Sequence, residues 1–173
     1  SLNRNPGYLH TLFVPERART AFPLFDQPDL KATYQLTLDL PDGWTALANG
    51  ALESIEPVDQ KQRHSFRTSE PISSYLFAFV AGDFQAVTRE LKGRSMTMLP
   101  RETDREKLES NVEAVFDLHV TALEWLETYT GIEYPFQSFG FVLIPSFQYG
   151  GMEHPGAITY RASSLLLEEN ATE

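Results

Sequence analysis

The sequence predicts an α+β fold, in which a series of short strands precedes one long helix and a few further strands. Three observations support this prediction: turn-bounded alternating segments up to about residue 92, one stretch of helical periodicity after residue 103, and a nearly continuous apolar run at 139–144. Strands have a period of 2 and helices a period of 3.6. The change of period near residue 93 therefore separates an all-β part from an α/β part.

The all-β part contains short segments with the composition of strands. They are Tyr8–Val14, Ala32–Leu40, Thr45–Asn49, Ala51–Pro57, His64–Thr68, Tyr75–Ala81 and Phe84–Leu91. Ala32–Leu40 alternates between apolar and polar residues, which is typical of a half-buried strand. Asn49-Gly50 is the strongest short signal for a hairpin. Strands at this spacing predict a partial β-sandwich or a large curved sheet.

The α/β part begins with a predicted strand, Arg94–Leu99. Thr103 and Glu106 then match a capping box, with a hydroxyl cap and a glutamate three residues later. Gly131 supplies the helix stop. The residues expected on the buried face of this helix are Leu108, Val112, Val115, Phe116, His119, Leu123 and Leu126.

Further strands are predicted after the helix. Phe139–Ile144 is apolar throughout, as expected for a strand covered on both faces. Ala157–Arg161 is a second strand, and a helix is expected to begin near Ser163. One helix and about three strands bury only a thin core. We therefore expect the chain to be a piece of a larger protein.

Composition excludes several classes of function. The formal net charge of −10 argues against nucleic acid or an anionic membrane surface as a partner. No apolar run is long enough to span a bilayer. The absence of cysteine excludes disulfides, a thiolate nucleophile and cysteine-ligated zinc. A soluble protein with this composition fits the cytosol or the periplasm, including export, and the sequence does not choose between them.

Local motifs for metal binding or nucleophilic catalysis are missing. No two of the four histidines have the three- or four-residue spacing with which a helix chelates zinc. His119 is interpreted as a core residue of the helix, and His154 has no second histidine near it in sequence. G-x-S-x-G, G-x-G-x-x-G and P-loop motifs do not occur. These motifs do not cover a triad assembled only in the fold, which sequence alone does not exclude. We expect no complete catalytic set and no metal site in this chain.

Two dense stretches stand out. Residues 13–31, "FVPERARTAFPLFDQPDLK", are interpreted as a rigid aromatic corner in which Arg17 or Arg19 pairs with Asp26 or Asp29. Residues 149–161, "YGGMEHPGAITYR", place a glycine pair and a carboxylate immediately before a strand. Glycine pairs weaken strands, and such a position is typical where another backbone approaches closely.

The two stretches together resemble the aminopeptidase N family of zinc metallopeptidases, which are of the gluzincin type. Members carry F-E-P-x-x-A-R, A-F-P-C-F-D-E-P and K-A-x-F, and farther on G-A-M-E-N. The residues that match the first block are Phe13, Pro15, Ala18, Arg19, Ala21, Phe22, Pro23, Phe25, Asp26, Pro28, Lys31 and Ala32. Gly150, Met152 and Glu153 match the second block, with Gly151 for alanine and His154 for asparagine.

This resemblance implies a domain organisation. Residues 1–92 would be the C-terminal half of a saddle-like N-terminal β domain. Residues 93–173 would begin a thermolysin-like α/β catalytic domain and would stop before its zinc motif, H-E-x-x-H. The cofactor implied is zinc in the parent protein, with none expected in this chain.

The resemblance also implies a function. Gly150, Gly151, Met152 and Glu153 would bind a peptide substrate through its free N-terminus, with Glu153 next to the α-ammonium group. In many family members a glutamine and a glutamate before the A-F-P block also bind the amine. Leu12 and Val14 occupy those positions here, so recognition would depend more on Glu153. The alternative is a non-enzymatic β-sandwich binding or scaffold module that shares the fold.

Overall fold

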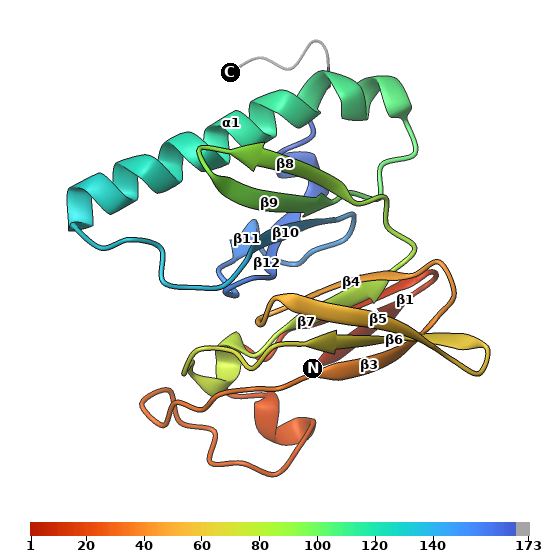
Figure 1. Ribbon diagram of the computed structural model, residues 1–173, viewed down its shortest axis with the longest axis vertical. Coiled ribbons are helices and arrows are strands. Elements are labelled where there is room, and N and C mark those ends of the chain that lie inside the picture. The colour runs from red at the N-terminus through yellow and green to blue at the C-terminus, as the bar shows by residue number, and fades with distance from the viewer. Residues whose placement is uncertain (169–173) are drawn as a thin grey trace.

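The computed structural model describes residues 1–168, and Figure 1 shows two halves stacked along the long axis of the molecule. One half contains helix α1 and a five-stranded sheet, and the other contains a four-stranded and a three-stranded sheet. The elements are β1 (Leu2–Asn5), β2 (Tyr8–Thr11), η1 (Ala18–Thr20), β3 (Thr37–Pro41), β4 (Thr45–Ala48), β5 (Leu52–Val58), β6 (Lys61–Phe66), η2 (Ser74–Leu76), β7 (Phe79–Gly82), β8 (Val87–Leu91), β9 (Arg94–Leu99), α1 (Arg105–Thr130), β10 (Phe139–Ile144), β11 (Gly151–Met152), β12 (Ile158–Arg161) and η3 (Ala162–Ser164), where η marks a 3₁₀ helix. The predicted α+β class is confirmed.

Two antiparallel sheets make up the first half. The four-stranded sheet has the order β1-β2-β7-β4, and the three-stranded sheet has the order β3-β6-β5. An apolar cluster joins them, because it combines residues of β3, β4, β6 and β7, namely Leu40, Ala46, Ala48, Phe66 and Ala81. The two sheets therefore share one core, as in a β-sandwich.

The Asn49-Gly50 turn does not close a hairpin, so that prediction is wrong. β4 precedes the turn and belongs to the four-stranded sheet, whereas β5 follows it and belongs to the three-stranded sheet. A Cβ atom on Gly50 would lie 1.8 Å from the carbonyl oxygen of Arg67. The glycine is needed because two backbones pass closely where the chain moves from one sheet to the other.

Several predicted strands are shorter than expected. The segments 32–40 and 75–81 form regular strands only in their second halves, where β3 and β7 begin. In the first halves, Tyr34 stacks on Phe77 with 4.6 Å between the ring centroids. The backbone N–H of Tyr34 donates to the hydroxyl of Ser69 instead of to a neighbouring strand. Segment 32–36 keeps isolated backbone hydrogen bonds to residues 66–72, such as the reciprocal pair between Ala32 and Ile72, but it does not form a regular ladder.

Helix α1 has the predicted stop but a different cap. Gly131 ends the helix in the left-handed region, with φ of 69°. The N-cap is Asp104, whose carboxylate accepts a hydrogen bond of 3.1 Å from the backbone N–H of Lys107. The predicted cap at Thr103 is therefore wrong by one residue. A carboxylate both caps the free N–H groups and interacts favourably with the positive end of the helix dipole.

One face of α1 packs on the five-stranded sheet. The buried residues of this face are Leu108, Val112, Val115, Phe116, His119, Val120 and Leu123. Leu126 was expected on the same face but is 48% exposed. Leu126 instead lines a cavity between α1 and the sheet, whose other walls include Phe139, Ile158 and Tyr160.

The five-stranded sheet has the order β11-β12-β10-β9-β8, with β10 in the centre. β10 is parallel to both β9 and β12, and α1 makes the crossover from β9 to β10. Phe141 and Leu143 belong to the cluster beneath α1, whereas Val142 and Ile144 belong to the cluster on the opposite face. The prediction of a strand covered on both faces is thus confirmed.

The predicted domain boundary at 92/93 does not coincide with the change of sheet. β8 already belongs to the five-stranded sheet, so the chain changes sheets between β7 and β8. The boundary itself stays a prediction.

The two halves are joined by a common hydrophobic core. Its buried members come from both sides of the junction: Tyr8, Leu12, Val80, Phe84, Leu99, Val142, Ile144, Phe147 and Met152. Burial of these apolar side chains stabilises the contact between the halves as well as each half.

A buried side-chain amide, Asn49, crosses the same junction. Its Nδ2 donates to the carbonyl oxygens of Leu76 and Pro155, each at 2.9 Å, and its Oδ1 accepts the backbone N–H of Ala78 at 2.7 Å. Only 3% of the residue is exposed. Asn49 thus ties the end of β4, the segment between η2 and β7, and the turn before β12 to one another.

Two histidines at the junction are buried without such partners. His10 and His154 are 4% and 0% exposed, and Nδ1 of His10 and both ring nitrogens of His154 have no hydrogen-bond partner among the described residues. Burial lowers the pKa of each ring to about 4. The N-terminal ammonium group adds to this effect at His10, and His10 adds to it at His154.

We predict that Asn49→Ala lowers the free energy of unfolding by about 3 kcal/mol, because it leaves a buried N–H and two carbonyl oxygens without their partner. Urea unfolding of the variant and the parent chain measures the difference. Asn3→Ala is the control, because the Asn3 amide makes one longer bond of 3.3 Å to the carbonyl of Ser1. Equal losses in the two variants would contradict the structural role of Asn49.

We predict that stability falls as the pH decreases from 7 to 5. The folded-state pKa of His10 and of His154 lies below the unfolded value of about 6.5, so the unfolded chain binds protons first. The two neutral histidines make their full contribution to the free energy of unfolding above about pH 6.5. This contribution decreases as the pH approaches 4, and at pH 5 the loss is about 2 kcal/mol for each ring. The double variant His10→Asn/His154→Asn should show a flatter dependence in urea unfolding, and parallel curves would refute the assignment.

Candidate functional site

The G-G-M-E stretch lies at an edge of the five-stranded sheet. β11 consists of Gly151–Met152 and pairs antiparallel with β12, so that Gly151 lies opposite Tyr160 and Met152 opposite Thr159. β11 has no neighbour on its other side within the described residues. An edge strand exposes backbone N–H and C=O groups, which another extended chain can bind.

The two glycines of this stretch differ in how much space surrounds them. A Cβ atom on Gly150 would meet no heavy atom within 4 Å, so the space beside it is open. A Cβ atom on Gly151 would lie 3.0 Å from Cδ1 of Tyr160, which is closer than side-chain packing normally allows. Gly151 therefore accommodates the Tyr160 ring, whereas Gly150 leaves the path along the strand free.

Met152 and Glu153 lie in opposite environments. Met152 is buried in the core that joins the two halves, and Glu153 is exposed. Within residues 1–168, the carboxylate of Glu153 takes part in no ion pair or side-chain hydrogen bond. A free carboxylate next to an anchored methionine is available to a cationic ligand.

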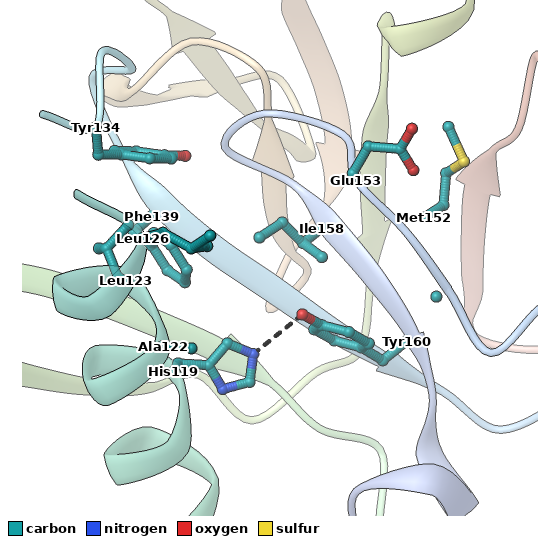
Figure 2. A pocket seen from close by; sticks show the side chains of 11 residues that line it. His119, Ala122, Leu123, Leu126, Tyr134, Phe139, Met152, Glu153, Ile158 and Tyr160 are labelled. Atoms are coloured by element: carbon teal, nitrogen blue, oxygen red, sulfur yellow. Dashed lines mark hydrogen bonds between the residues drawn. The ribbon is translucent and has the colours of Figure 1, made fainter. Parts of the chain in front are cut away.

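A cavity of about 440 Å³ borders this carboxylate. Figure 2 shows it between side chains of α1, such as Leu123 and Leu126, and side chains of β12, Ile158 and Tyr160, with Glu153 at one side. Most of its lining is apolar. The carboxylate therefore lies where an open edge strand meets an apolar hollow beneath the end of α1.

His119 and Tyr160 form the polar pair of this cavity (Figure 2). Nδ1 of His119 donates to the carbonyl oxygen of Val115 at 2.7 Å, so Nε2 accepts from the hydroxyl of Tyr160 at 3.3 Å. The imidazole also stacks on Phe141 with 4.2 Å between the ring centroids. Burial lowers the pKa of His119 and raises the pKa of Tyr160, so both stay neutral near pH 7. The interpretation of His119 as a core residue is confirmed.

The first dense stretch, 13–31, forms a corner held by hydrogen bonds rather than by the predicted ion pair. The guanidinium of Arg19 pairs with Glu16 at 3.1 Å. Asp26 instead accepts the backbone N–H of Arg19 at 3.0 Å and the hydroxyl of Ser74. The predicted pairing to Asp26 or Asp29 is therefore wrong, because the carboxylate of Asp26 fixes backbone geometry.

The structure brings the chain at the start of that stretch, together with the preceding Leu12, close to the G-G-M-E segment. Leu12 is buried in the same core as Met152, and Val14 packs against that core. Neither side chain can bind an amine, and both serve to join the first half of the molecule to β11.

A zinc site does not fit the residues that the structure describes. Among residues 1–168, no group of three or more histidine, cysteine, aspartate or glutamate side chains could hold a metal ion. His154 points into the protein interior, where it is fully buried, and it lies beside His10 without a carboxylate partner.

Two residues near β11 had no role assigned from the sequence. The ring of Tyr160 leaves no room for a side chain at position 151, which accounts for the glycine there. Arg161 donates to the carbonyl oxygens of Phe147 and Gln148. Both belong to the predicted strand Ala157–Arg161, but the pattern of that strand says nothing of what lies beside it. Their proximity to β11 depends on the pairing of strands, which sequence periodicity alone does not reveal.

No helix in the part of the chain that the structure describes has the length and apolar character needed to cross a membrane.

Comparison with known proteins identifies the family. The sequence profile of the Peptidase M1 N-terminal domain matches residues 3–76, and that of the Peptidase family M1 domain matches residues 114–173. The chain is 34% identical to puromycin-sensitive aminopeptidase of Caenorhabditis elegans over 165 residues, which are 94% of this chain and 17% of that protein. It is 34% identical to aminopeptidase N of Streptomyces lividans over 159 residues, which are 90% of this chain and 18% of that protein.

A third relative is glutamyl aminopeptidase of Sus scrofa, at 35% identity over 161 residues, which are 90% of this chain and 16% of that protein. The chain thus spans less than a fifth of the length of these curated relatives. The two M1 profiles match in the expected order and together cover more than three quarters of the chain. The chain belongs to the M1 family of peptidases, the family of aminopeptidase N.

Proposed function

We propose that this chain supplies the substrate-binding strand of a zinc-dependent aminopeptidase, which removes N-terminal residues from peptides. The observation that carries the proposal is the free carboxylate of Glu153 at the end of an edge strand, beside the open space at Gly150. Membership of the M1 family and the aminopeptidase relatives support it.

The edge strand suits the backbone of an extended peptide. A substrate that lies along β11 extends the five-stranded sheet by backbone hydrogen bonds, which hold peptides of many sequences. Gly150 presents no side chain on its open side, so the substrate backbone comes close there. Met152 anchors the strand from behind, because it is buried in the core between the two halves.

Glu153 gives the strand its preference for an N-terminus. A carboxylate and an α-ammonium group form a charge-assisted hydrogen bond, which a blocked or internal residue of a peptide cannot make. Leu12 and Val14 contribute only apolar packing to this region. Three positions match amine-binding residues of the family, namely Leu12, Val14 and Glu153. Of these three, Glu153 is the one whose side chain can bind the amine.

The catalytic metal belongs to a part of the protein outside the described residues. Zinc held elsewhere in the parent protein would supply Lewis acidity to the scissile carbonyl and to a water molecule. Gly150–Glu153 bind and orient the substrate, and they do not supply a base or a ligand. We accordingly propose that residues 1–92 belong to an N-terminal β domain and 93–173 to the catalytic domain, and that the chain alone is inactive.

The parent gene provides the first test. An H-E-x-x-H motif encoded beyond Glu173 supports the aminopeptidase. The rival proposal, a non-enzymatic β-sandwich binding or scaffold module, requires that no such motif follows.

In the full-length protein, Glu153→Gln should reduce kcat/KM for aminoacyl substrates by a factor on the order of 100, because it removes the charge but keeps the shape of the side chain. The measurement is steady-state hydrolysis of an aminoacyl p-nitroanilide. Glu133→Gln, another exposed glutamate in the catalytic half, is the matched control and should retain activity. If Glu153→Gln also retains full kcat/KM, the assignment of Glu153 is wrong.

The purified 173-residue chain should bind no stoichiometric zinc at pH 7, because two buried, neutral histidines without a carboxylate do not form a structural zinc site. Equilibrium dialysis followed by elemental analysis measures the zinc content. One tightly bound zinc per chain would disprove the placement of the metal site elsewhere in the protein.

A further inference from the structure

We infer that Arg161 is a positioning residue, whose guanidinium group fixes the loop 145–150 and thereby the placement of Gly150–Glu153. This inference rests on the proposed function for its significance, but its structural basis is independent of catalysis. Arg161 is the last residue of β12, the strand beside β11.

Arg161 binds the loop at three points. Its Nε donates to the carbonyl oxygen of Phe147 at 3.1 Å, and its Nη2 donates to the carbonyl oxygen of Gln148 at 3.2 Å. Its backbone N–H donates to the carbonyl oxygen of Gly150 at 2.9 Å. Within residues 1–168, these are the hydrogen bonds that hold loop 145–150 to the rest of the chain.

The loop has one other anchor, the ring of Phe147. Phe147 is 4% exposed and packs edge-on against the ring of His10, whereas the other five residues of the loop are exposed. An exposed loop with a single buried side chain is free to rotate about that side chain. The two guanidinium bonds to successive carbonyl groups remove this freedom.

The chemistry of the contact requires arginine. The guanidinium is planar and presents several N–H donors in a fixed geometry, so that one side chain bridges two neighbouring carbonyl oxygens. A lysine ammonium keeps the charge but is a point donor on a flexible stem, and it satisfies one of the two acceptors at a time.

The strand that carries Glu153 is held from both ends: Met152 and His154 are buried on either side of Glu153, and Asn49 binds the carbonyl oxygen of Pro155, whereas Arg161 holds the loop that precedes Gly150. Gly150 joins the loop to β11, and β11 is only two residues long. Two residues of ladder and the buried Met152 hold the strand on one side, and Arg161 holds the chain that enters it. Loss of the Arg161 contacts therefore releases the N-terminal end of the substrate strand.

Amide hydrogen exchange of the 173-residue chain tests this inference without any activity. Arg161→Met keeps the length of the side chain and removes its donors, and it should increase exchange of the backbone amides of residues 152 and 161 about tenfold. Arg161→Lys should restore part of the protection. Exchange in α1 should stay unchanged in both variants.

Arg89→Met is the matched control. Arg89 is also an arginine of the five-stranded sheet, in β8, and its guanidinium pairs with Glu113 on α1 at 2.6 Å. The Arg89→Met variant should show the same rate of amide exchange at residues 152 and 161 as the unmutated chain. Unchanged exchange there in Arg161→Met, or an equal increase in Arg89→Met, would overturn the inference.

Kinetics of the full-length protein separate this inference from the proposed function. Arg161→Met should raise KM for aminoacyl substrates about tenfold and change kcat less than twofold, because the loop positions the amine-binding end of the site. A lower kcat with an unchanged KM contradicts the positioning role. Full activity of Glu153→Gln contradicts the proposed function instead, and leaves the exchange result for Arg161 intact.

Discussion

The arrangement of the molecule depends on the buried amide of Asn49. Its three hydrogen bonds connect the end of β4, the segment before β7 and the turn at Pro155, which lie on both sides of the junction. An amide with all these partners costs little to bury, and its geometry is strict because each bond has a preferred direction. The carbonyl of Pro155 lies two residues after Glu153. The first half of the molecule therefore helps to determine where β11 lies in the second half.

The same junction contains buried ring nitrogens without a hydrogen-bond partner among residues 1–168, namely Nδ1 of His10 and both nitrogens of His154. Unpaired buried polar groups are rare in folded proteins, and their cost must be offset elsewhere. Here the offset comes from the surrounding aromatic and aliphatic side chains, including Phe147 and Met152. Both histidines stay neutral near pH 7 because charging them in this core is unfavourable. The buried polar residues thus have different effects. Asn49 fixes the geometry of the junction, whereas His10 and His154 make its stability sensitive to acid.

Periodicity predicted the elements whose side chains point into a core. β9 and β10 have the expected bounds, and the buried face of α1 differs mainly at Leu126. Periodicity failed where a side chain interrupts the regular ladder, as at Tyr34, whose backbone N–H donates to the hydroxyl of Ser69. It also failed where Asn49 served a distant contact instead of a local turn. The site shows the same limit. The family motif led to the proposal of Gly150–Glu153, which stays a prediction, but the contacts of Arg161 arise only when β11 and β12 pair, and no local pattern encodes that pairing.

The short length of β11 also affects how molecules of this protein meet one another. A long, flat edge strand is a template for β-pairing between copies and leads to aggregation. β11 offers two residues, and the opposite edge, β8, carries Arg89 and Glu90 in the middle of its sequence. Both edges of the five-stranded sheet are thereby poor templates for self-association. An edge of this length can pair with a short extended segment without offering a long template to another copy of the chain.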